Sequence, residues 1–120
     1  MDSDVEGLES GLAAYELKEY AKAFELLMPL AEQGVPEAQA IIGDFYFLGL
    51  GGVVPVSGPE TVRWWTKAGE GGYSLSYWNL GTIYTAGMPG VACDPEQALR
   101  CKEKAVELGF DMIPMGWRDG

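Results

Sequence analysis

The sequence predicts an all-α protein, an α/α superhelix (solenoid) made of about three stacked helix pairs. The first observation is a glycine-tyrosine-glycine pattern that recurs after 38 residues, at Gly43, Tyr46 and Gly49 and then at Gly81, Tyr84 and Gly87. The second is that the offset falls to 37 beyond the following loop, where Lys67 and Ala68 are matched by Lys104 and Ala105. Repeats of about 20 to 50 residues are typical of solenoids, in which each unit buries the apolar face of its neighbour.

A partial earlier copy at residues 20–34 completes the repeat pattern. The three repeats are then 5–34, 35–72 and 73–109, in one domain that spans 1–120. Six helices are expected, alternating as first and second members of a pair, at about 5–17, 20–33, 36–48, 59–71, 74–86 and 95–108. In the third of them, Ala38, Ile42 and Phe45 recur at spacings of three and four residues, which predicts a buried stripe.

Capping residues predict where several of these helices begin and end. Ser57 and Asp94 each stand shortly before a Pro-Glu pair, where a side-chain oxygen can accept a hydrogen bond from the first helical turn. Gln97 is placed to complete a capping box with Asp94. Three glycines suit the left-handed conformation that ends a helix, namely Gly34, Gly72 and Gly109.

Two glycines fall in the middle of predicted helices, Gly43 and Gly81. Glycine at such a position is less favourable than alanine by about 1 kcal/mol. Close approach of a neighbouring helix is the expected reason for both. A larger residue at Gly43 is therefore expected to push its helix pair apart.

The tail at 110–120 is apolar but is broken by proline and glycine, so no further helix pair is expected there. The last unit of a solenoid would otherwise expose an apolar face to water. We expect the tail to cap that face through Met112, Ile113 and Trp117. A contact between two copies of the chain is the alternative, although a monomer is favoured over a homodimer.

Further residues of the two later units carry a resemblance to a known family. In one unit they are Ala38, Gln39, Ile42, Gly43, Tyr46, Gly49, Gly52, Val53, Trp64, Lys67 and Ala68. In the next they are Ser76, Asn79, Leu80, Gly81, Tyr84, Gly87, Gly90, Val91, Asp94, Gln97, Ala98, Lys104, Ala105, Glu107 and Gly109. Over roughly residues 8–110 the chain resembles the Sel-one-like repeat family, a longer-looped relative of tetratricopeptide repeats.

The resemblance implies an α/α superhelix that scaffolds protein complexes and rarely carries chemistry of its own. It also implies that the first helix of each pair lines the concave face and the second covers the outside. Three positions depart from the family pattern. Cys101 stands where an aromatic residue is usual, and Thr61 and Gly69 each replace an expected alanine. These departures concern the packing of the helices and not the fold.

Composition excludes several classes of function. The chain has 120 residues, a net charge of −10 and no histidine. Nucleic acid and membrane are not expected partners, because phosphate groups attract clustered Lys and Arg. Without histidine, imidazole acid–base catalysis and most transition-metal sites are excluded. The chain has no run of 18 apolar residues and no signal-peptide pattern, so a cytoplasmic protein is expected.

No catalytic residue, cofactor site or metal site is predicted. Cys93 and Cys101 lie eight residues apart, which matches no common zinc or redox spacing, so both are expected to be free thiols. Cys101 is expected in the core, where free cysteine is common. The loops at 49–58 and 87–93 are rich in glycine but lack the Gly-Lys-Ser/Thr sequence of a phosphate-binding loop.

The distribution of charge predicts the character of the concave groove. The expected first helices, taken as 1–17, 36–48 and 73–86, contain seven acidic residues and no basic one. By the residue-by-residue match to the family, the groove-lining positions are Asp44, Phe47, Leu48, Trp78, Asn79, Thr82 and Thr85. Phe47 and Trp78 are expected to supply most of the binding energy, because aromatic residues dominate interfaces. For Trp78, packing against a neighbouring helix is the alternative.

The sequence favours a non-catalytic interaction module or adaptor that binds a basic or apolar polypeptide in this acidic and aromatic groove. One alternative is an immunity protein that covers a basic toxin, since opposite charge speeds the encounter of two proteins. A competing class is a carboxylate-dependent hydrolase. That class requires two carboxyl groups about 5 to 9 Å apart in one cleft.

Overall fold

The computed structural model describes residues 2–110, which form six α-helices and one short 3-10 helix. The elements are α1 (Asp2–Glu16), α2 (Tyr20–Glu32), α3 (Pro36–Leu48), η1 (Leu50–Gly52), α4 (Gly58–Glu70), α5 (Ser74–Ala86) and α6 (Pro95–Glu107). Every predicted helix is present, and no boundary differs from its predicted position by more than three residues. The predicted all-α class is confirmed.

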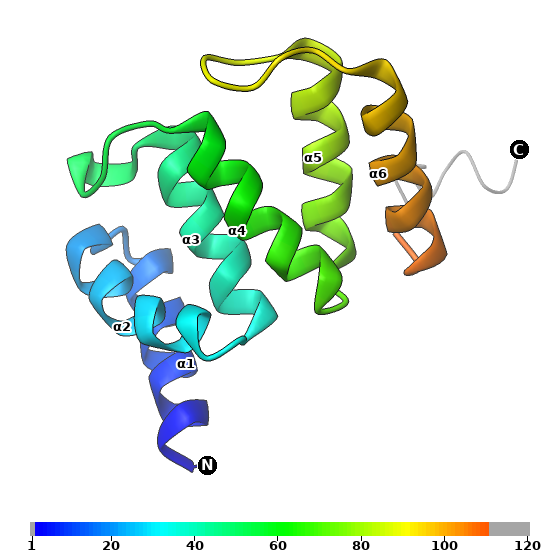
Figure 1. Ribbon diagram of the computed structural model, residues 1–120. Helices are drawn as coiled ribbons and strands as arrows, with labels where there is room; N and C mark the ends of the chain where they lie inside the picture. The colour runs from blue at the N-terminus through cyan, green and yellow to red at the C-terminus, as the bar shows by residue number, and fades with distance from the viewer. Residues whose placement is uncertain (1, 111–120) are drawn as a thin grey trace, which may run out of the picture.

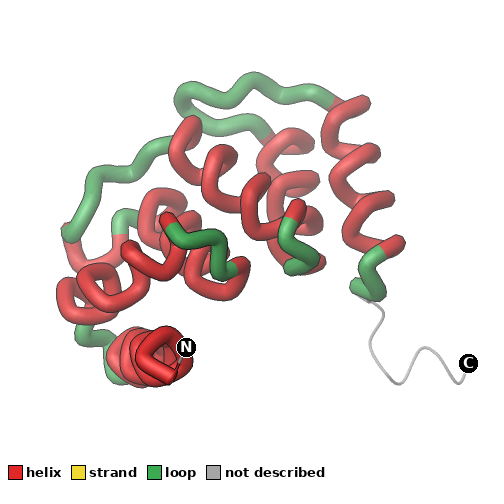
Figure 2. Tube along the Cα trace, turned by 60° about the horizontal axis from the view of Figure 1, so that its bottom comes forward, coloured by secondary structure: helices red, strands yellow, loops and turns green. Residues whose placement is uncertain are grey.

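Consecutive helices pack side by side, so the chain advances from α1 to α6 as an arch of helix pairs (Figure 1). Within the pairs, α1 packs on α2, α3 on α4 and α5 on α6, while α2–α3 and α4–α5 contacts join one pair to the next. The described residues contain helices and loops and no strand, as the second view shows (Figure 2). This arrangement is the stacked α/α architecture that the repeat predicts.

The long loop inside each later pair returns to the preceding helix in the same way. The backbone N–H of Ser57 donates to the carbonyl of Tyr46 at 2.9 Å, and that of Asp94 donates to the carbonyl of Tyr84 at 2.8 Å. Both tyrosines belong to the repeated glycine-tyrosine-glycine pattern. The two loops therefore place the starts of α4 and α6 at equivalent points, although one loop is a residue shorter.

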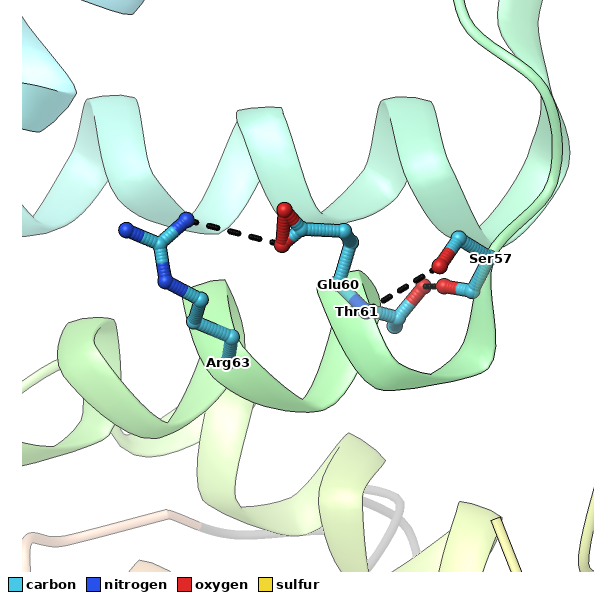
Figure 3. Close-up of polar contacts among 4 residues, drawn as sticks. All are labelled: Ser57, Glu60, Thr61 and Arg63. Carbon is cyan, nitrogen blue, oxygen red and sulfur yellow. Dashed lines mark hydrogen bonds and ion pairs between the residues drawn. The ribbon is translucent and has the colours of Figure 1, made fainter. Parts of the chain in front are cut away.

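Helix α4 begins with the predicted serine cap (Figure 3). Ser57 Oγ accepts a hydrogen bond from the N–H of Glu60 at 3.2 Å, and Thr61 Oγ1 donates to the Ser57 carbonyl at 2.7 Å. An exposed Arg63–Glu60 ion pair of 3.5 Å lies one turn further along. Thr61 is fully buried, so its hydroxyl hydrogen bond explains how a threonine is accepted where the family has alanine.

At α6 the predicted cap is right and the predicted capping box is wrong. Asp94 Oδ1 accepts from the N–H of Gln97 at 3.1 Å, as expected for an N-cap. The return bond from the Gln97 side chain does not form, because the Asp94 N–H already donates to Tyr84. The Gln97 side-chain oxygen accepts instead from Arg100 at 2.6 Å.

Glycines end the second helix of each pair, as predicted. Gly34, Gly72 and Gly109 have φ angles of 100°, 101° and 93°, which lie in the region that side chains disfavour. Each lets the chain turn at once into the next segment. The three helix pairs are therefore connected by short, similar turns.

Two apolar cores lie on either side of α4. Trp64 joins the core formed with α1, α2 and α3, where Leu27, Ile42 and Phe45 are fully buried. The next residue, Trp65, joins the core formed with α5 and α6 around Leu80. Adjacent tryptophans on one helix thus tie the first half of the solenoid to the second.

Close approach of a neighbouring side chain explains three of the glycines within helices, Gly43, Gly69 and Gly81. A Cβ atom at Gly43 would lie 2.1 Å from Cδ1 of Trp65, so the indole ring occupies the space of the missing side chain. At Gly81 the same space is filled by the aliphatic stem of Lys102, 2.6 Å from the Cβ position. Gly69 makes room for the Tyr77 ring in the same manner, which accounts for its departure from the family alanine.

Only the first residue of the predicted C-terminal cap lies within the described residues. Phe110 stacks on Trp78 of α5 with ring centroids 5.0 Å apart. The expected cap by Met112, Ile113 and Trp117, and the alternative contact between two copies, concern residues outside the described part and stay predictions.

Two further features of the described residues concern thiols and membranes. Cys93 is exposed, Cys101 is buried, and both are free thiols, as predicted. No described helix combines the length and the apolar character needed to cross a bilayer.

Candidate functional site

A pocket lies between α3 and α5, the first helices of two adjacent pairs, with α4 beneath it. Its volume is about 390 Å³, which falls in the range of small-ligand sites. The lining residues are Asp44, Phe47 and Leu48 of α3, Trp65 of α4, Asn79, Thr82, Ile83 and Ala86 of α5, and Gly87 and Met88 of the next loop. We call this site the α3–α5 pocket.

Five of the seven groove positions named from the sequence line the α3–α5 pocket. They are Asp44, Phe47, Leu48, Asn79 and Thr82. The helical register explains their meeting, because residues three and four apart share one face of a helix. The 38-residue repeat then turns the matching faces of α3 and α5 toward the same space.

Trp78 and Thr85, the other two positions, lie outside the pocket. Trp78 faces α6, where its ring stacks on Phe110 and Nζ of Lys102 sits 4.8 Å above it. The geometry therefore shows Trp78 packed against its neighbours, which is the alternative to a position in the groove. Thr85 is exposed and donates its hydroxyl hydrogen bond to the Gly81 carbonyl at 2.8 Å within its own helix.

Trp65 is the most important lining residue that the sequence reasoning missed. It is 3% exposed, its ring lies over Gly43, and its Nε1–H donates to the carbonyl of Ala40 at 3.0 Å. Phe47 packs on it with ring centroids 5.2 Å apart. The one available signal was a break in the repeat, because the matching position in the next unit is Lys102.

Asp44 gives the pocket its charge. Among the described residues that line the pocket, no other side chain is ionised at neutral pH. Its Oδ2 accepts a hydrogen bond from the Tyr15 hydroxyl of α1 at 3.4 Å, which is long for such a bond. The structure shows no ion pair to Asp44 within residues 2–110.

Burial makes Asp44 an unusual carboxyl group. Desolvation raises its pKa to about 6, although the nearby Trp65 N–H and Tyr15 O–H both favour the ionised form. Burial and the Asp44 charge together raise the pKa of Tyr15 to about 12. Burial, with the charges of Glu37 and Asp44, also raises the pKa of Tyr73. Both tyrosines are therefore neutral at pH 7, and Asp44 alone of these three groups changes charge between pH 5 and 7.

The pocket combines three kinds of surface. Phe47, Leu48, Trp65, Ile83 and Met88 supply an apolar wall, Asn79 and Thr82 supply neutral polar groups, and Asp44 supplies one carboxylate. Such a lining can hold an apolar or cationic group. Acid–base chemistry on a sugar would need a second carboxyl group, and the described lining residues provide none.

Comparison with known proteins identifies the repeats. The family model described as the Sel1 repeat matches residues 36–73 and 74–110. A Sel1 repeat protein from Oxalobacter formigenes has a solved structure that is 32% identical, with a TM-score of 0.76 over 83% of this chain. The protective antigen c5321 of uropathogenic Escherichia coli, which displays an SLR fold, is 28% identical, with a TM-score of 0.81 over 89% of this chain.

A curated relative is chitin synthase regulatory factor 3 of Schizosaccharomyces pombe, which is 32% identical over 80 residues, or 67% of this chain. All three proteins are longer. The chain spans 8% of the fungal protein, 40% of the Oxalobacter chain and 23% of the E. coli chain. The matched repeats, which cover most of the chain, show that this protein belongs to the Sel1 repeat family.

Proposed function

We propose that this protein is a non-catalytic interaction module that binds a segment of another polypeptide along α3 and α5. The observation that carries the proposal is the α3–α5 pocket, an open and mostly apolar site built from equivalent faces of two repeats. Phe47 is 39% exposed and Leu48 is 58% exposed at its edge. Exposed aromatic and aliphatic groups around a pocket are typical of sites where a partner side chain is inserted.

The family supports the same general role, because Sel1 repeats generally mediate protein interactions. The fungal relative is named as a regulatory factor of chitin synthase. By analogy, the present chain would act on another protein by binding it. A hydrolase is disfavoured because its pair of carboxyl groups is missing from the described lining of the pocket.

Charge favours a basic partner. The net charge of −10 attracts a cationic surface at long range and speeds association. The same attraction between opposite charges would act on a basic toxin neutralised by this chain and on a basic segment of an enzyme or scaffold. The two cases differ in outcome, because an immunity protein abolishes the activity of its partner and an adaptor leaves it intact.

Truncating Phe47 tests the proposal. Affinity capture from the native host, followed by mass spectrometry, identifies partners of the wild-type protein. We expect Phe47→Ala to raise the dissociation constant of the captured partner by about thirtyfold. A loss of about 2 kcal/mol, which is typical of an interface hot spot, corresponds to a change of this size. Calorimetry or fluorescence anisotropy with the purified partner would measure this change.

The matched control is Leu99→Ala. Leu99 is 60% exposed on α6, outside the α3–α5 pocket, so its truncation removes a similar apolar group from another surface. Its affinity should equal that of the wild type. Equal losses in both variants, or a loss for Leu99→Ala alone, would place the interface elsewhere on the molecule.

A further inference from the structure

The α3–α5 pocket contains an ionised group with no countercharge. Asp44 is half-buried, and the pocket residues beside it are aromatic, aliphatic or neutral polar. Buried charges in proteins are normally paired, because removing a charge from water is expensive. Here the one hydrogen bond found for the carboxylate within residues 2–110 is the long bond from Tyr15. Within residues 2–110, no positive group therefore balances the negative charge of Asp44.

The surroundings of Asp44 also suit a long side chain. Phe47 and Trp65 form a tilted aromatic pair in the same pocket as the carboxylate, and Leu48, Ile83 and Met88 complete its apolar lining. Lysine and arginine carry an apolar stem that packs on such a wall while the charged end reaches a carboxylate. Aromatic rings beside the site favour a cation further.

We propose that the α3–α5 pocket receives one lysine or arginine side chain of the bound polypeptide, with its cation on Asp44 and its stem against Phe47 and Trp65. This inference rests on the proposed function and specifies which chemical group the partner presents. It also explains why a carboxylate is kept in a half-buried place without a basic neighbour. Selectivity arises because a neutral side chain of the same length would leave the carboxylate unpaired.

The pocket should lose its cation when Asp44 is protonated. The titratable groups that face Asp44 are Tyr15 from α1 and Tyr73 at the start of α5. Glu37, near the start of α3, lies close to Tyr73. Both tyrosines remain neutral below pH 8. Binding of a cation should therefore weaken as the pH falls through about 6, the pKa of Asp44.

Small probes test this without knowledge of the partner. n-Butylammonium and n-butylguanidinium stand for lysine and arginine, and n-pentanol is the neutral counterpart. Titrations would follow the Trp65 Nε1–H resonance by NMR, because this group lies beside the site. We expect saturable shifts with the two cations at pH 7.5 and binding about tenfold weaker at pH 5, where roughly a tenth of the carboxyl is ionised. Comparison of the two cations shows which side chain is preferred.

Two variants separate the carboxylate from general charge. Asp44→Asn keeps the shape of the pocket and should weaken binding of both cations by about tenfold or more, while n-pentanol binding stays the same. Glu37→Gln removes one negative charge from an exposed position on the same helix and should bind the cations as the wild type does. Circular dichroism would verify that both variants are folded.

The outcomes distinguish this inference from the proposed function. If the cations bind no better than n-pentanol, or bind equally to Asp44→Asn, the cation site is wrong. If a polypeptide partner still requires Phe47 for binding, the proposed function as an interaction module is supported even so. If the cations bind as expected and the identified partner ignores Phe47 and Asp44, the site is real and the proposed function is wrong.

Discussion

Replacing Gly43 by alanine is expected to lower the free energy of unfolding by about 2 to 4 kcal/mol. The new Cβ would overlap Cδ1 and Nε1 of Trp65, which lie 2.1 and 2.4 Å from its position. The indole must therefore move, which disturbs the core around Leu80 and breaks the hydrogen bond to Ala40. These losses exceed the gain in helix propensity of about 1 kcal/mol. Urea denaturation would measure the change.

The control is Gly7→Ala. Gly7 lies within α1, and the nearest atom to its Cβ position is Cδ1 of Leu30 at an ordinary 3.6 Å. This substitution should raise stability by up to about 1 kcal/mol, since propensity acts without a clash. Gly81→Ala should fall between the two, because the stem of Lys102 is more flexible than an indole ring. Equal stability of Gly43→Ala and Gly7→Ala would contradict the packing described for Trp65.

Replacing Asp44 by asparagine is expected to stabilise the folded protein at neutral pH. The pKa of Asp44 is about 6 in the fold, against about 4 in an unfolded chain, so the ionised form is disfavoured by folding. Each unit of pKa corresponds to about 1.4 kcal/mol, which gives up to about 3 kcal/mol at pH 7.5. Asparagine removes the charge and can still accept the Tyr15 hydrogen bond.

The pH dependence has a definite sign. Between about pH 4 and pH 6 the folded protein holds a proton on Asp44 that the unfolded chain releases, so wild-type stability falls as the pH rises through this range. Asp44→Asn lacks this contribution. The excess of its free energy of unfolding over that of the wild type should therefore be close to zero at pH 4 and should reach its full value by pH 7.5. Chemical denaturation at both pH values would measure the difference, and the same advantage at both would show that Asp44 has an ordinary pKa.

Stability and binding are thus expected to oppose each other at Asp44. The carboxylate is expected to destabilise the free protein at pH 7, whereas our proposal has it bind the cation of the partner. Such a conflict is common at functional sites, where residues are kept for binding and not for folding. Asp44→Asn should be both more stable and a weaker binder.

The fold could be predicted from the sequence because its causes are local or periodic. Helix starts follow from Ser57 and Asp94, helix ends from the three terminal glycines, and the stacking from a repeat of about 38 residues. Five of the pocket positions also followed, because the resemblance to the family implies that the first helix of each pair lines the concave face. The repeat alone does not say which face of a helix is concave.

The rest of the site depends on side chains that break the repeat. Trp65 became the floor of the pocket because the ring fills the space above Gly43, whereas Lys102 occupies the matching place in the next unit. Trp78 turned away from the groove because Lys102 and Phe110 cover its ring, and the spacing of the repeat reveals neither contact. The absence of basic residues from the groove was predicted, because the expected first helices contain none. The half-burial of Asp44 depends on packing in space, which no spacing in the sequence reveals.

The most direct test of the central claim is the rate at which the identified partner associates with Asp44→Lys. At about 50 mM salt the reversed charge should slow association strongly, and at about 500 mM salt the rate should approach that of the wild type, because salt screens the attraction. Glu37→Lys, which reverses an exposed charge outside the α3–α5 pocket, should slow association less and should leave the dissociation rate unchanged. Indistinguishable kinetics for Asp44→Lys and Glu37→Lys, or a rate for Asp44→Lys that salt does not change, would contradict a basic segment entering the pocket at Asp44.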